Sequence, residues 1–271
     1  MDWDAWERLG VLGLDEIALK RGHRDFVTLV TVPLEGGGVE IVAVLADRKK
    51  ETVAAFLRTI PATLRRTIEC ACTDLYEGFV NAITEEIPGV EIVIARFHGA
   101  RAYRDCADMV RKTELKRLKC QLPKAEYAEV TGAMWPFRQR PGELKPEEWD
   151  LLERLFTDSP TIEVAYHLRE DLTDLFDRDD TTVGAKCAIR AWCTRVRQSR
   201  LAEVERVLGT IERWQDEITN DFQGRQTSGF VEGFNNRVKV LTRRCYGLFN
   251  VGRLFQRLTL DWHGYQRFGH T

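Results

Sequence analysis

A stretch near the C-terminal end of the chain, residues 226–250, places a carboxylate, amides and cations at helical spacing. After the turn formers at 227–229, apolar residues recur every three or four positions, which predicts an amphipathic helix. The apolar stripe consists of Val231, Phe234, Val238, Leu241 and Cys245. The polar stripe beside it consists of Glu232, Asn235 or Asn236, Lys239 and Arg243. A carboxylate followed by amides and cations suits a metal-bound phosphodiester. The alternative is an ordinary amphipathic helix with a solvated polar face.

A metal site of this kind needs further carboxylates, and the N-terminal third offers a first one. Residues 11–19, 26–33 and 39–45 are typical of strands, and the turn formers at 21–23 and 35–38 separate them, so they predict an antiparallel meander of three strands. Asp15 lies inside the first strand, where strand propensity disfavours an acidic residue. The alternative is that Asp15 lies on a solvated sheet face.

A second carboxylate follows the next predicted strand. Residues 49–66 are typical of a helix that Pro61 kinks or ends early, and residues 67–75 are typical of a short buried strand that ends at Asp74. Open α/β sheets carry their chemistry at the carboxyl ends of strands, which favours a functional role for Asp74. The alternative is an N-cap for the helix that follows. Another apolar strand is predicted at residues 90–95.

The predicted order of elements is three antiparallel strands, a helix, a strand, a helix and a strand. This order predicts the ribonuclease-H-like α/β mixed sheet, in which the first and fourth strands are neighbours. Asp15 and Asp74 would then lie side by side although 59 positions separate them (74 − 15). Two adjacent carboxylates repel unless they share a cation, so a divalent-metal site explains the pair.

The rest of the chain predicts helices. A basic helix at residues 101–119 is followed by a proline-punctuated, loop-rich stretch and then by helical patterns at 146–157, 161–176, 182–197 and 201–222. We therefore predict three segments: a first part of the catalytic core at 1–119, an all-α insertion at 120–225, and the C-terminal helices of the core at 226–271. Three tryptophans of the insertion, Trp149, Trp192 and Trp214, are predicted to be core residues.

Charge is segregated along the chain although its formal net value is −2. Residues 96–119 carry 8 Lys/Arg against 3 Asp/Glu, residues 142–180 carry 4 against 13, and residues 229–268 carry 7 against 2. No apolar run is long enough to span a bilayer, and no signal-peptide pattern is visible. The seven scattered cysteines include no zinc-ligand spacing, which favours reduced thiols in a cytoplasmic protein.

Three motifs together resemble the catalytic domain of bacterial insertion-sequence DDE transposases of the ISL-three family. They are LGLDEIALKRGH, CTDLYEGFVNAI and SGFVEGFNNRVKVLTRRCYGLFN. The resemblance extends over essentially the whole chain, including AMWPFRQRP and LFQRLTLDWHGYQRFG. The two aspartates and the helix-borne glutamate of that family match Asp15, Asp74 and Glu232.

The resemblance implies metal-dependent cleavage of DNA strands and transfer of a 3′-hydroxyl to a new phosphate. Asp15, Asp74 and Glu232 would hold two Mg²⁺ ions, with Mn²⁺ as a substitute, and DNA would be the partner. His98, Asn235 and Asn236 are expected to shape the site. The residues expected to contact DNA are Lys239, Arg243, Arg244, Arg237, Arg101, Arg104, Arg111 and Lys112. The alternative for each basic residue is ordinary solvated surface.

Two departures from the family pattern favour an alternative function, a weakened or inactive transposase-derived protein that binds DNA or oligomerises. Relatives usually carry an acid three residues before the histidine that matches His98, and this chain has Ala95 there. Relatives also carry an N-terminal zinc-binding and helix-turn-helix region before the first catalytic strand, which is expected to be missing here. A separate polypeptide would then supply it. We further expect a homo-oligomer in the bacterial cytoplasm, associated with the nucleoid.

Overall fold

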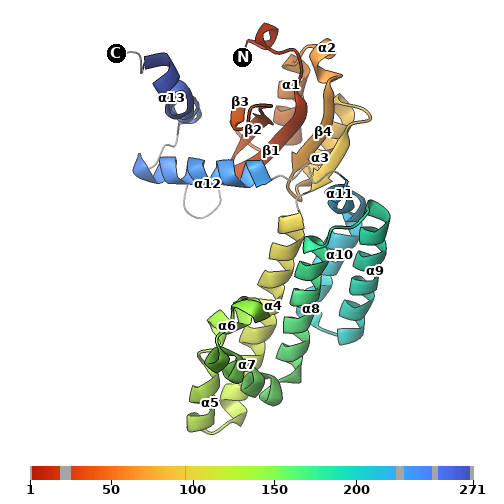
Figure 1. The fold of residues 1–271 in the computed structure, drawn as a ribbon, viewed down its shortest axis with the longest axis vertical. Coiled ribbons are helices and arrows are strands. Elements are labelled where there is room, and N and C mark those ends of the chain that lie inside the picture. The colour runs from red at the N-terminus through yellow and green to blue at the C-terminus, as the bar shows by residue number, and fades with distance from the viewer. Residues whose placement is uncertain (1, 19–25, 95, 224–228, 246–249, 269–271) are drawn as a thin grey trace. The chain divides into compact units, whose positions relative to one another are not determined.

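The computed structural model describes residues 2–18, 26–94, 96–223, 229–245 and 250–268. The chain divides into two compact units (Figure 1). The first, here the sheet unit, joins Met1–Ala95 to Gly224–Thr271, and the second, the helical unit, is Arg96–Gln223.

The sheet unit contains a five-stranded mixed sheet in the order β3-β2-β1-β4-β5. Its strands β1, β2 and β3 are antiparallel, whereas β4 pairs in parallel with both β1 and β5. This confirms the predicted ribonuclease-H-like arrangement, in which the first and fourth strands are neighbours (Figure 1). The strand bounds are β1 Gly10–Ala18, β2 Phe26–Pro33, β3 Val39–Leu45, β4 Ile68–Thr73 and β5 Glu91–Ile94.

The turn between β2 and β3 depends on its glycines. Gly37 and Gly38 adopt φ values of 84° and 95°, a region that side chains with a Cβ rarely enter. The backbone N–H of Leu34 donates to the Gly38 carbonyl, and the N–H of Gly37 donates to the Leu34 carbonyl. The predicted glycine-rich turn is therefore confirmed.

Helices cover both faces of the sheet. One face packs against α1 (Lys50–Thr59), α2 (Ala62–Arg65) and α3 (Glu77–Glu86), and its core includes Leu12, Leu14 and Phe79. The other face packs against α12 (Gly229–Arg244) and α13 (Val251–Phe268). Successive side chains of β1 point to opposite faces of the sheet. Pro61 ends the first helix early, because the residue before a proline avoids helical backbone angles.

Apolar side chains buried between the sheet and helices α12 and α13 hold these two helices in place. Ile17, Val27, Leu29 and Ile41 of the strands contact the apolar stripes of both helices. Each fully buried aliphatic side chain contributes on the order of 1.5–3 kcal/mol. The buried helical members are Phe234, Val238, Leu241, Leu254 and Leu258, with Cys245 partly buried beside them.

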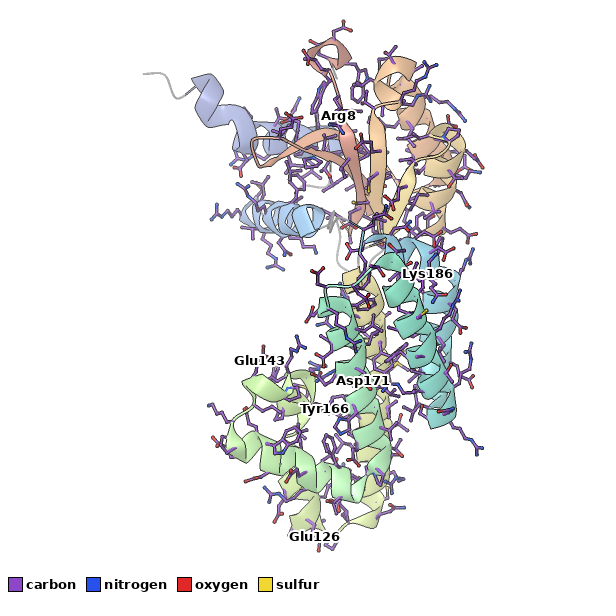
Figure 2. The ribbon with its side chains drawn as sticks, turned by 45° about the vertical axis from the view of Figure 1, so that its right-hand side comes forward. Arg8, Glu126, Glu143, Tyr166, Asp171 and Lys186 are labelled. Carbon is purple, nitrogen blue, oxygen red and sulfur yellow. The ribbon has the colours of Figure 1, made fainter. Side chains whose placement is uncertain are left out.

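The helical unit is built around two long helices, α4 and α8, which pack against each other. Its core contains large aromatic side chains, among them Tyr103, Tyr166 and Trp192, all nearly inaccessible to water (Tyr166 is labelled in Figure 2). The bounds are α4 Arg96–Gln121, α5 Lys124–Val130, α6 Met134–Arg138, α7 Pro146–Asp158, α8 Pro160–Asp177, α9 Thr182–Ser199, α10 Glu205–Arg213 and α11 Gln215–Asn220. Short 3₁₀ turns lie at Pro141–Glu143 and Ala202–Val204 in this unit and at Trp3–Ala5 in the sheet unit.

The helical unit differs from the sequence prediction in three places. The basic helix begins at Arg96 rather than 101 and packs within the helical unit, so the boundary falls at 95/96 rather than 119/120. The stretch predicted to be loop-rich contains α5 and α6, because Pro123 lies just before a helix, where its missing N–H costs nothing. The helix predicted at 201–222 breaks at Trp214.

The tryptophan prediction is largely confirmed. Trp192 and Trp214 are buried, and the half-buried Trp149 donates its indole N–H to Glu153.

All seven cysteines are free thiols. Over the residues that the structure describes, no helix is both long and apolar enough to cross a membrane.

Candidate active site

The pairing of β1 with β4 brings the two predicted aspartates level with each other. The strands run parallel with Gly13 beside Cys72, an offset of 59 positions (72 − 13). The same offset joins Asp15 to Asp74 (74 − 15), which follows directly after the last residue of β4. Leu29, the cross-strand partner of Asp15, packs under α12 and α13, so Asp15 lies on that face of the sheet.

Backbone N–H groups fix both carboxylates. The Asp74 Oδ1 accepts from the N–H of Tyr76 at 3.1 Å, and the Asp15 Oδ1 accepts from the N–H of Glu16 at 2.6 Å. Helix α3 begins only at Glu77, with Tyr76 at its N-cap position. Asp74 therefore holds the turn between β4 and α3, and the alternative of an N-cap at Asp74 is wrong.

The ionised form of the Asp74 carboxyl group is disfavoured. Its partial burial is the largest cause that raises its pKa, and the negative charges of Asp15 and Glu16 raise it further, to about 7. The hydrogen bond from Tyr76 and the charge of Arg48 oppose this shift but do not cancel it. A divalent cation at this position would offset the repulsion between the two aspartates, so the donor set fits a hard metal ion.

Arg48 lies beside the two aspartates and was not identified from the sequence. Its guanidinium donates to Glu16 Oε2 at 2.6 Å, and this hydrogen bond is the largest cause that raises the pKa of Arg48. The guanidinium carbon lies 4.4 Å from the ring centroid of Phe26 and 4.8 Å from that of Tyr76. Arg48 therefore joins β1, β2 and the turn that carries Asp74. A signal was present in the sequence, an acid directly after Asp15 and an arginine just after the third strand.

Replacing Arg48 is expected to raise the pKa of Asp74 further. Arg48→Ala removes a nearby positive charge and two cation–π contacts, each worth about 0.5–1 kcal/mol at exposed sites. We expect Asp74 to titrate at a higher pH and the unfolding free energy to fall by about 1–2 kcal/mol. A carboxyl-carbon NMR titration and urea unfolding measure both quantities. Arg48→Lys keeps the charge and should shift the pKa less; an unchanged Asp74 pKa in the alanine variant would contradict the role of Arg48.

Helix α12 carries the third predicted carboxylate in its first turn. The helix contacts β1, and Phe234 shares a core with Ile17, two residues beyond Asp15 on the same sheet face. The side chains of Glu232, Asn235 and Val231 lie outside the described residues. The amide and cationic side chains of α12 that the structure describes are exposed: Asn236, Arg237, Lys239, Arg243 and Arg244.

Among the side chains that the structure describes, which do not include Glu232, no three His, Cys, Asp or Glu residues form a metal-binding group. Ala95 and the side chain of His98 also lie outside the described residues. The remaining predicted DNA contacts lie on α4 in the helical unit, where Arg101, Arg104 and Lys112 are exposed and Arg111 is buried.

The sheet has this strand order, with one aspartate inside β1 and the other directly after β4, and this arrangement is that of a ribonuclease-H-like transposase domain. The family model for ISL-three DDE transposases, whose description is "Transposase", matches residues 12–258. The chain therefore belongs to the ISL-three family of DDE transposases.

Two relatives are similar along nearly the whole chain. The transposase for insertion sequence element IS1001 of Bordetella parapertussis is 25% identical over 263 residues, covering 97% of this chain and 63% of the relative. The transposase for insertion sequence element IS1557 of Mycobacterium tuberculosis is 23% identical over 282 residues, covering 96% and 62%. The chain thus spans somewhat less than two thirds of the length of these relatives.

Proposed function

We propose that this chain is the catalytic domain of a DDE-type transposase, which cleaves DNA strands and joins the resulting 3′-hydroxyl to target DNA in a metal-dependent reaction. The observation that carries the proposal is the parallel pairing of β1 with β4, which brings Asp15 level with Asp74 on the sheet face covered by α12. Membership of the ISL-three family supports it independently.

In this proposal Asp15, Asp74 and Glu232 hold two Mg²⁺ ions. Bound Mg²⁺ would lower the pKa of an attacking water and neutralise charge on the phosphate oxygens. The protein's own part is to hold hard oxygen ligands in a fixed arrangement: the Tyr76 and Glu16 N–H groups orient the two aspartates, and Arg48 anchors the turn that carries Asp74. The exposed cations of α12, Lys239, Arg243 and Arg244, would contact DNA phosphates.

The proposal is tested with purified protein, Mg²⁺ or Mn²⁺, labelled oligonucleotides that carry the ends of the element, and a target plasmid. We expect nicks at the element ends and labelled strands joined to the plasmid, both abolished by EDTA. Cuts without joined products would support a nuclease on the same fold instead. Absence of both products with either metal would count against the proposal.

Ala95 favours a second candidate, a transposase-derived protein that binds DNA without cleaving it. This candidate predicts DNA binding with no carboxylate-dependent metal binding, which calorimetric titration with Mn²⁺ measures directly. The retention of all three acids, Asp15, Asp74 and Glu232, favours the catalytic proposal over this one.

A further inference from the structure

One tryptophan of the helical unit is far more exposed than the others. The side chain of Trp135, on α6, is 64% exposed, whereas Trp192 and Trp214 are buried. The guanidinium carbon of Arg138, one turn later, lies 5.9 Å from the Trp135 ring centroid. An indole left in water retains a large apolar face that a flat partner could cover.

Arg138 connects this tryptophan to a cluster with surplus positive charge. The Asp108 carboxylate binds three cations: Arg111 at 2.7 Å, Lys112 at 2.9 Å and Arg138 at 2.8 Å. Burial opposes ionisation of Asp108, but these hydrogen bonds outweigh it and hold its pKa well below the usual range. One carboxylate and three cations leave the cluster with a net charge of +2, and the exposed members are Lys112 and Arg138. Such a cluster is complementary to an anion.

The positive surface continues along α4. Lys112, Lys116 and Lys119 are exposed and recur at spacings of four and three, which places them on one side of the helix. Met109, next to Asp108, is 50% exposed and adds apolar surface. The exposed acid on this part of α4 is Asp105. We call Trp135, Arg138, Lys112, Lys116 and Lys119 the α4–α6 face.

We propose that the α4–α6 face binds an unpaired segment of DNA, with its cations on the phosphates and Trp135 stacked on a base. Basic side chains combined with an exposed aromatic ring are the pattern by which proteins hold single strands. A duplex presents its phosphates but not its base faces, so the tryptophan favours an unpaired base. Surplus charge makes this face unsuited to an apolar protein partner, because its cations would lose water without gaining counter-charges. The inference rests on the proposed function insofar as DNA is the partner.

The test measures fluorescence anisotropy of labelled 20-nucleotide strands and matched duplexes in EDTA, so that binding is separated from cleavage. We expect Trp135→Ala to weaken single-strand binding about tenfold, with less than a twofold effect on duplex. Trp135→Phe should retain most of the affinity, because its ring still stacks. Lys112→Ala should weaken binding of both DNAs and reduce the salt slope by about one. Val183→Ala is the matched control, since Val183 is 72% exposed on α9 and is not part of the α4–α6 face.

Equal affinity of Trp135→Ala and wild type for the single strand would overturn the inference, as would equal losses for single strand and duplex. A wild-type dimer that Trp135→Ala converts to monomer, with DNA binding unchanged, would overturn it in favour of self-association. The doubly substituted Asp15→Asn/Asp74→Asn protein keeps the two proposals apart, because it should lose nicking and still bind the single strand through Trp135. Trp135-dependent binding without any nicking by wild type refutes only the catalytic proposal, and nicking by wild type without Trp135-dependent binding refutes only this one.

Discussion

Asp15→Asn, Asp74→Asn and Glu232→Gln are each expected to reduce DNA nicking and strand joining by about a thousandfold or more. An amide keeps the size of the side chain but removes the negative charge that binds Mg²⁺. Stabilisation of transition-state charge by a metal is worth several kcal/mol, and each 1.36 kcal/mol corresponds to a factor of ten in rate. Nicking of labelled element ends under single-turnover conditions measures the loss.

A matched control for these variants is Asp150→Asn, which changes an exposed carboxylate on α7 in the same way. It should nick DNA at the wild-type rate. Wild-type nicking by any one of the three active-site variants would refute the role of that residue. Circular dichroism and thermal unfolding show whether the inactive variants are still folded.

Asp15→Cys and Asp74→Cys distinguish a metal ligand from a residue that only shapes the site. A thiolate is a poor ligand for the hard Mg²⁺ ion and a better one for softer transition metals. We therefore expect these variants to be inactive in Mg²⁺ and to recover part of their activity in Mn²⁺. A residue that acts only through packing gives no such dependence on the metal.

The carboxylate pair could be predicted because it depends on strand order. The succession of strands and helices implied that β1 and β4 are neighbours, which brings Asp15 and Asp74 together. The apolar stripe of α12 likewise follows from spacing, and Phe234, Val238 and Leu241 are buried against the sheet as expected. Local periodicity and topology together were enough for these elements.

The surroundings of the pair could not be predicted in the same way, because they depend on tertiary contacts between distant residues. Arg48 reaches Glu16, 32 positions away, and stacks on Tyr76, and neither contact has a periodic signal. The exposure of Trp135 depends on how α6 packs. The prolines at 136 and 141 suggested a loop, so α6 itself was not predicted. Helix α4 begins one turn before residue 101, at Arg96. Gly99 and His98 in that turn made this start difficult to predict.

The burial of Asp74 has a consequence for stability that differs from that of most acidic residues. An aspartate ordinarily has a pKa of 3.8, whereas burial and the neighbouring acids raise the pKa of Asp74 to about 7. The folded protein therefore binds this proton more tightly than the unfolded chain does. Stability of the metal-free protein falls as the pH rises from about 4 to about 7 and stays low above it. A difference of about three units corresponds to a loss of up to about 4 kcal/mol.

Asp74→Asn is accordingly expected to stabilise the metal-free protein at pH 8 by up to about 4 kcal/mol and to have little effect at pH 4. The amide cannot ionise, yet its oxygen can still accept the hydrogen bond from Tyr76. Mg²⁺ should stabilise the wild type at pH 8, because it offsets the repulsion between Asp74 and Asp15, and should stabilise the variant less. Urea unfolding at both pH values, with EDTA or Mg²⁺, measures these four differences. A variant that is less stable than wild type at pH 8 would mean that the Asp74 carboxylate is not held in an unfavourable environment, and the electrostatic case for a shared cation would fail with it.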